Sequence, residues 1–68
     1  MSISVSANGK PYQIEPSTTV AQFIGQRELD PRHVVVELNG EPLARTQYED
    51  LKLEDGDRLE LVRAVAGG

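Results

Sequence analysis

Residues 3–24 read ISVSANGKPYQIEPSTTVAQFI and predict a β-hairpin followed by a helix. On both sides of Asn8-Gly9, apolar residues alternate with polar ones, which is the period of a strand with one face buried and one face in water. An Asn-Gly pair tolerates the positive φ angles of a tight hairpin turn. Pro11 removes a backbone donor that an edge strand can spare. We therefore expect a hairpin over residues 2–15, with its second strand at a sheet edge.

A short helix is expected next, over residues 20–28. Thr19 and Gln22 match a capping box, in which the threonine hydroxyl accepts from the backbone N–H of the glutamine and the glutamine side chain reaches back. Asp30-Pro31 ends the helix, because the residue before proline is pushed out of the α region. A helix this short is marginal alone, so its apolar stripe must pack on the sheet. The stripe consists of Val20, Phe23 and Ile24.

More strands are expected after the helix. The β-branched run over residues 33–38 predicts one strand, a second Asn-Gly pair predicts another tight turn, and Pro42 marks the short return over residues 41–43 as an edge. A polar loop containing a 3₁₀ turn precedes the last strand, which is expected over residues 58–65. This order predicts an α+β fold in which one helix covers one face of a four- to five-stranded sheet.

Strand parity separates a buried face from an uncovered one. The residues expected to face the helix are Ile3, Val5, Ile14, Val34, Val36, Leu38, Leu59 and Leu61. The opposite parity places Val35, Val62 and Ala64 on the uncovered face, beside the strand that leads to the carboxyl end. Isolated surface apolar residues are normal, but a small apolar patch at this place suits a docking partner. Arg63 interrupts the buried parity, so we place it at the core margin, where it can contact acidic groups of a partner.

Composition excludes several classes of protein. The chain has 68 residues, a formal net charge of -4 and no cysteine. A chain of this length buries about 60% of its unfolded surface, so we expect one small core and no enclosed substrate cavity. Without cysteine there is no disulfide, iron–sulfur ligation or thiol catalysis. The acidic balance argues against nucleic acid, and the lack of a long apolar run or a basic leader favours the cytoplasm.

No catalytic residue and no metal site are expected. His33 is the single histidine, and a lone histidine beside a strand is usually solvated or packed. The acidic residues of 49–57 lack the ligand pattern of a calcium loop, so turn formation and solubility explain them better. With one histidine and no cleft, no Ser-His-Asp triad is credible, and the chain has no phosphate-binding loop. We expect a protein that is not itself an enzyme.

The carboxyl end carries the sharpest functional signal. Gly67-Gly68 come directly after the last predicted strand and, without a Cβ, fit a slot too narrow for other residues. Fully extended, the segment from Val65 to Gly68 reaches about 13–14 Å past the sheet, so we expect Val65, Ala66 and Gly67 to enter a partner's active site. The Gly68 carboxylate is ionised at neutral pH and is a poor electrophile, so another protein must activate it. We expect one domain over residues 1–65 and a flexible tail from Ala66.

Taken together, the chain resembles the ThiS family of sulfur carrier proteins of thiamine biosynthesis, within the ubiquitin-like β-grasp superfamily. The resemblance covers essentially all of the chain, and its most telling pieces are Asn8-Gly9, Thr19-Val20, residues 35–40, residues 54–57 and Val65-Ala66-Gly67-Gly68. It implies a mixed sheet with the first and last strands as parallel neighbours at its centre. It also implies no bound cofactor and no catalytic residues in the carrier itself.

The same resemblance implies a reaction and its partners. A ThiF-like adenylating enzyme uses ATP to adenylate the Gly68 carboxylate. A sulfur donor fed by a cysteine desulfurase system then displaces AMP and leaves a thiocarboxylate on Gly68. A thiazole synthase accepts that sulfur. Carrying sulfur on the terminus explains how a chain without cysteine serves as a sulfur carrier.

Four alternatives remain open at this point. One is the small subunit of a molybdopterin synthase, which uses the same terminal chemistry but is usually longer. A second is a sulfur carrier for another pathway, such as cysteine biosynthesis. A third is a ubiquitin-like modifier that forms isopeptide bonds with lysines, and a fourth is an interaction module in which the glycines are idle. A monomer is the default expectation for the chain alone.

Overall fold

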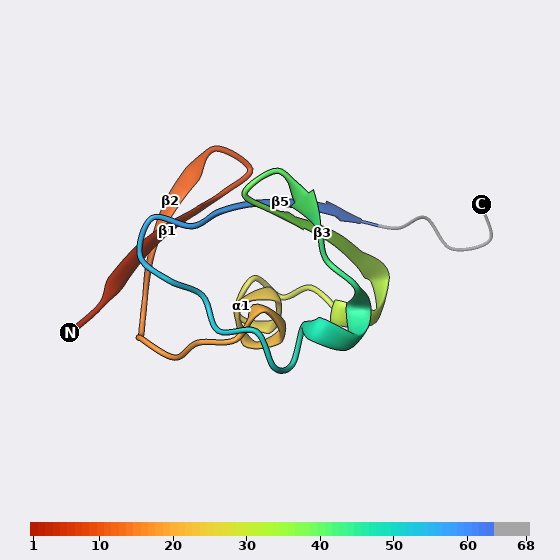
Figure 1. Cartoon of the computed structure of the whole chain (residues 1–68), viewed down its shortest axis with the longest axis horizontal. Coiled ribbons are helices and arrows are strands. Elements are labelled where there is room, and N and C mark those ends of the chain that lie inside the picture. The colour runs from red at the N-terminus through yellow and green to blue at the C-terminus, as the bar shows by residue number, and fades with distance from the viewer. Residues whose placement is uncertain (64–68) are drawn as a thin grey trace.

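The computed structural model describes residues 1–63, in which the strands form one sheet and an α-helix packs on one of its faces (Figure 1). The strands are β1 (Ile3–Ala7), β2 (Lys10–Ile14), β3 (Val34–Leu38), β4 (Glu41–Pro42) and β5 (Arg58–Arg63). The helix is α1 (Val20–Gln26), and two 3₁₀ turns span Pro31–His33 and Arg45–Gln47. No helix in this part of the chain has the length and apolar character that crossing a membrane requires.

β5 occupies the centre of the five-stranded sheet, whose order is β2-β1-β5-β3-β4. It runs parallel to β1 and antiparallel to β3, and the two outer pairs of strands are also antiparallel. The predicted mixed sheet, with its first and last strands as parallel neighbours, is confirmed. Pro11 and Pro42 both lie on edge strands, as predicted. The strand that leads to the carboxyl end is therefore held by a neighbour on each side.

Both Asn-Gly pairs form the predicted tight turns. Asn8 and Gly9 have φ angles of 53° and 82°, and Asn39 and Gly40 have φ angles of 52° and 87°. Positive φ at both central residues gives a turn whose twist matches that of the flanking strands. The predicted turn before β5 is also present, with Gly56 at a φ of 89°. The two Asn-Gly turns set the registers of the β1–β2 and β3–β4 pairs.

The capping box of α1 is confirmed. The Thr19 hydroxyl accepts from the backbone N–H of Gln22 at 3.1 Å, and the Gln22 side chain accepts from the backbone N–H of Thr19 at 2.9 Å. The helix ends at Gln26, before the predicted end at residue 28. The reason is Glu28, which takes a left-handed conformation with a φ of 63° that no α-helix can continue through.

The connection between α1 and β3 differs from the prediction. Asp30 does not close the α-helix. Its carboxylate accepts from the backbone N–H of Arg32 at 2.9 Å and so caps the 3₁₀ turn of Pro31–His33. His33 belongs to this turn, and the prediction that it opens the third strand is wrong, because the side-chain cap bends residues 31–33 before β3 begins at Val34.

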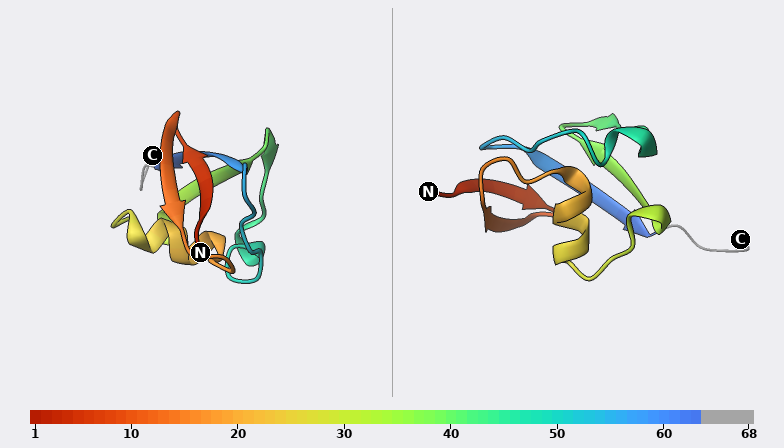
Figure 2. Two further views of the ribbon diagram at one scale, coloured as in Figure 1. Left: turned by 90° about the vertical axis from the view of Figure 1, so that its left-hand side faces the viewer. Right: turned by 90° about the horizontal axis from the view of Figure 1, so that it is seen from below.

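The core lies between the sheet and α1, and within residues 1–63 no helix packs on the opposite face of the sheet (Figure 2). Its buried residues are Val5, Ala7, Ile14, Val20, Phe23, Ile24, Val34, Val36, Tyr48, Leu53 and Leu59. Three residues of the predicted inner face, Ile3, Leu38 and Leu61, are partly buried against this core. Tyr48 and Leu53 come from the segment between β4 and β5, so their side chains attach that loop to the core.

Gly25 lowers the stability of α1. It is exposed, and a Cβ at this position would meet nothing within 4 Å. Gly25→Ala is expected to raise the free energy of unfolding by about 0.5–1 kcal/mol, because glycine loses more backbone freedom than alanine on entering a helix. Urea denaturation followed by circular dichroism measures the change. Gly56→Ala, at a φ of 89°, is the control and is expected to lose stability; equal shifts in the two variants would contradict this account.

Candidate functional site at the end of β5

An apolar pair lies on the open face of the sheet, near the end of β5. Val62 is the cross-strand partner of Val35 on β3. The two residues are 60% and 46% exposed, whereas their neighbours of opposite parity, Leu61 and Val36, face the core. The predicted exposure of this pair is confirmed, and its use as a docking surface stays a prediction. Ala64, the third residue of the predicted patch, lies outside the described residues.

Arg63 lies at the margin of the core. It shares the parity of Leu59 and Leu61 and is the cross-strand partner of the buried Val34, yet it is exposed. A long charged side chain at such a place covers apolar surface with its stem and keeps its guanidinium in water. This is the predicted placement, and the guanidinium is accessible to a partner's carboxylates.

The remaining predicted site residues lie outside the described part of the chain. They are the attachment residue Gly68 and the three residues expected to enter a partner's active site, Gly67, Ala66 and Val65. The predicted boundary between domain and tail, after residue 65, also lies there. Their roles therefore remain predictions, and the described structure ends with the strand β5, which precedes them in the chain.

Two asparagines tie the hairpin turns to β5. The Asn8 side-chain amide donates to the carbonyl of Leu61 at 3.1 Å, and its oxygen accepts from the backbone N–H of Leu61 at 2.8 Å. On the other side of β5, the Asn39 oxygen accepts from the backbone N–H of Arg58 at 2.9 Å. The sequence predicted only turn residues here. The strand order, which local patterns do not reveal, brings both amides onto the backbone of β5 and fixes the strand that carries the candidate site.

A small charged cluster precedes β3, near the cross-strand partner of Arg63. Arg32 donates to both carboxylate oxygens of Asp30, at 3.2 and 2.9 Å. Hydrogen bonds from the Arg32 side chain and backbone lower the pKa of Asp30 to about 2. His33 is exposed, with its Nδ1 3.8 Å from the same carboxylate. This agrees with the prediction of a solvated histidine.

Two acidic residues before β5 accept hydrogen bonds from the backbone, one within the turn and one from β1. Asp55 accepts from the backbone N–H of Ser4 at 2.8 Å, and Asp57 accepts from the backbone N–H of Glu54 at 2.8 Å. Among residues 1–63, no three histidine, aspartate or glutamate side chains gather in a way that would hold a metal ion. The predicted turn-forming role is confirmed for Asp57, and for the other acidic residues of 49–57 it stays a prediction.

The fold and the exposed end of β5 define a class of protein. One helix on a five-stranded mixed sheet, with the last strand at its centre, is the ubiquitin-like β-grasp fold. A family model described as the ThiS family matches residues 5–68. The chain belongs to the ThiS family.

Individual relatives agree with this assignment. The sulfur carrier protein ThiS of Bacillus subtilis is 32% identical over 62 residues, which cover 90% of this chain and 94% of that protein. A crystal structure of the thiamine biosynthesis protein ThiS from Geobacter metallireducens superposes with a TM-score of 0.78 at 29% identity, covering 97% of this chain and 100% of that one. A thiazole synthase of Paramagnetospirillum magneticum is 36% identical over 61 residues; the match covers 90% of this chain but only 19% of that longer protein.

Proposed function

We propose that this protein carries sulfur as a thiocarboxylate on Gly68 for the formation of the thiazole ring of thiamine. The observation that carries the proposal is the family match over residues 5–68, which runs through Gly67 and Gly68. The similarity to the Bacillus subtilis sulfur carrier over 94% of that protein's length supports it. The chain acts as a cosubstrate of other enzymes and has no catalytic residue of its own.

The chemistry follows from the carboxylate. An oxygen of the Gly68 carboxylate attacks the α-phosphorus of ATP on a ThiF-like adenylating enzyme, and pyrophosphate leaves. Adenylation replaces a poor leaving oxygen with AMP, which a sulfur nucleophile can displace. The terminal sulfur of a persulfide attacks the acyl carbon, so a carbon–sulfur bond forms, the carbon–oxygen bond to AMP breaks and AMP leaves. A thiol then reduces the sulfur–sulfur bond of the resulting acyl disulfide, becomes part of a disulfide itself, and leaves the terminus as a thiocarboxylate. The ATP is bound and consumed by the partner, and a cysteine desulfurase system supplies the sulfur.

A thiazole synthase is the proposed sulfur acceptor. A segment similar to this chain occurs within the Paramagnetospirillum magneticum thiazole synthase, at 36% identity over 61 residues. A carrier that must deliver sulfur to an acceptor gains effective concentration when both lie in one chain. That pairing in a relative favours a thiazole synthase over a pterin-forming enzyme as the acceptor here.

The proposed docking surface lies beside the end of β5 and consists of Val35 and Val62 on the open face, Arg63 at the margin of the core, and Ala64, which follows them in the chain. Val35 and Val62 supply a small exposed apolar area, and Arg63 supplies a cation at its margin. Apolar anchors with a charged rim are the usual composition of a protein interface. A partner seated there is aligned with the strand from which residues 64–68 continue.

An intact-mass measurement tests the proposed function. The full chain is incubated with its adenylating enzyme, ATP, a cysteine desulfurase, cysteine and a thiol reductant. We expect a mass gain of about 16 Da, the exchange of one oxygen for sulfur, and no gain in a chain that lacks Gly68. Protein without the gain but with products linked to lysine would contradict the proposal and indicate a ubiquitin-like modifier.

Val62→Asp tests the docking surface. A buried, unpaired carboxylate at an apolar contact is costly, so adenylation of the variant is expected to slow by about tenfold or more. Folding is expected to be unchanged, because Val62 is exposed. Gln13→Asp on β2 is the matched control, since it adds the same charge to an exposed strand position. Equal rates for the two variants, measured by pyrophosphate release, would remove Val62 from the interface.

A further inference from the structure

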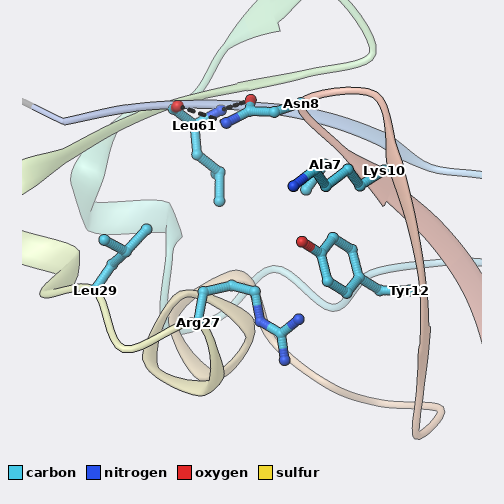
Figure 3. Close-up of a pocket in the computed structure, with 7 residues that line it drawn as sticks. All are labelled: Ala7, Asn8, Lys10, Tyr12, Arg27, Leu29 and Leu61. Atoms are coloured by element: carbon cyan, nitrogen blue, oxygen red, sulfur yellow. Dashed lines mark hydrogen bonds between the residues drawn. The ribbon is translucent and has the colours of Figure 1, made fainter.

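A hollow of about 250 Å³ lies on the helix-covered side of the sheet, beside the β1–β2 hairpin (Figure 3). Its walls come from that hairpin, from the residues after α1 and from β5: Ala7, Asn8, Lys10, Tyr12, Arg27, Leu29 and Leu61. Pockets that enclose small ligands measure about 300–1,000 Å³. This hollow is therefore suited to one or two amino-acid side chains rather than to a nucleotide.

The hollow has an apolar side and a polar side. The side chains of Leu29 and Leu61 point into it, and the Lys10 ammonium and the Tyr12 hydroxyl point into the same space (Figure 3). Within residues 1–63, no hydrogen bond or ion pair uses either polar group. An apolar wall beside an unpaired ammonium and an unpaired hydroxyl suits a ligand that combines an aliphatic group with a carboxylate.

Stacking of Arg27 and Phe23 on Tyr12 orders the polar side of the hollow before any ligand binds. The guanidinium of Arg27 lies 4.4 Å from the ring centroid of Tyr12 and 5.4 Å from that of Phe23. The two rings meet edge to face, with centroids 5.6 Å apart. These contacts hold the Tyr12 ring, so its hydroxyl is positioned before a ligand arrives.

The charge of the hollow contrasts with that of the chain. Among the described residues, its lining includes the cations Lys10 and Arg27 and no acidic side chain, whereas the chain has a net charge of -4. A local concentration of positive charge in an acidic protein favours a partner that presents a carboxylate.

We propose that this hollow receives a segment of the adenylating enzyme that presents an aliphatic side chain next to a carboxylate. The aliphatic side chain packs on Leu29 and Leu61, and the carboxylate pairs with Lys10 and accepts a hydrogen bond from Tyr12. This inference rests on the proposed function, and it adds to the proposed docking surface a second contact between the chain and its adenylating enzyme. Leu61 and Val62 are consecutive residues on opposite faces of β5, so a partner that contacts both faces fixes the direction in which Gly68 is presented.

The affinity of the full chain for its adenylating enzyme tests the inference. Isothermal titration calorimetry without ATP compares Lys10→Glu with Lys52→Glu. Both variants lower the net charge by the same amount, and Lys52 is exposed and does not line the hollow. Lys10→Glu is expected to weaken binding by about tenfold or more, and Lys52→Glu by less than about twofold. Tyr12→Phe, which keeps the ring stacked on Arg27, is expected to weaken binding by about threefold, through the hydroxyl alone.

Several outcomes would overturn the inference. Equal weakening by the two lysine variants would assign the effect to overall charge. If the NMR chemical shifts of the Ala7 and Leu61 amides change when residues 64–68 are removed, the hollow is occupied by the chain's own carboxyl-terminal segment. If the wild-type chain forms dimers and Lys10→Glu dissociates them, the hollow is occupied by a second copy of the chain. If the wild-type chain takes up sulfur and Lys10→Glu does so at an unchanged rate, this inference alone fails. If the wild-type chain neither binds the enzyme nor takes up sulfur, the proposed function fails with it.

Discussion

Gly67→Val is expected to abolish sulfur loading while leaving the folded domain intact. The proposed reaction requires the Gly68 carboxylate to reach ATP inside another protein, through a slot that admits a backbone without side chains. A valine Cβ and its two methyl groups occupy the space that glycine leaves free. Misplacing the reacting carboxylate by about 1 Å costs about 100-fold in rate, so we expect adenylation to fall by at least that factor.

The measurement compares pyrophosphate release with thermal stability. The buried core is built from residues between Val5 and Leu59, so the melting temperature of Gly67→Val is expected to match that of the wild type. Ala44→Val is the matched control, since it introduces valine at an exposed position before the 3₁₀ turn of Arg45–Gln47. Gly67→Ala is expected to lie between the two, because its side chain is smaller. Full activity in Gly67→Val would mean that no narrow slot exists, and a lowered melting temperature would mean that Gly67 packs on the domain.

Local chemistry explains why most of the fold was predictable. The Asn8-Gly9 turn and the Thr19 capping box each depend on residues within a few positions of one another, and both occur as predicted. Alternation of polar and apolar residues correctly placed Val35 and Val62 on the exposed face, because one side of the sheet is covered by α1. Where a pattern is local and one face is buried, sequence alone suffices.

The features that escaped prediction depend on contacts between distant segments. Asn8 bonds to Leu61 across the sheet, and this pairing follows only once β1 and β5 are known to be neighbours. The hollow beside Leu61 likewise needs the hairpin, the end of α1 and β5 in place at once. Glu28 ends α1 early by taking a left-handed conformation, which glutamate seldom adopts and which no local signal indicated.

Tyr48→Phe is expected to destabilise the domain strongly, although it removes only one oxygen. Among residues 1–63, β4 pairs with β3 only at Glu37 and Leu38, and no described strand lies beside the outer edge of β3 nearer its start. The Tyr48 hydroxyl replaces that partner: it accepts from the backbone N–H of Val36 at 3.1 Å and donates to the carbonyl of Val34 at 3.0 Å. Tyr48 is only 3% exposed, so the change leaves two buried backbone groups without this partner.

Each unsatisfied buried group costs about 1–3 kcal/mol, so the expected loss in the free energy of unfolding of Tyr48→Phe, which leaves two such groups, is about 2–6 kcal/mol. In a domain of this size that corresponds to a fall in melting temperature of at least about 10 °C. Tyr12→Phe is the matched control, because no hydrogen bond within residues 1–63 uses its hydroxyl, and we expect a change within about 0.5 kcal/mol. Equal melting temperatures for the two variants would mean that water satisfies the edge of β3. A large difference would establish that the Tyr48 side chain, 12 residues along the chain from Val36, takes the place of a neighbouring strand at the outer edge of β3, the strand that carries Val35.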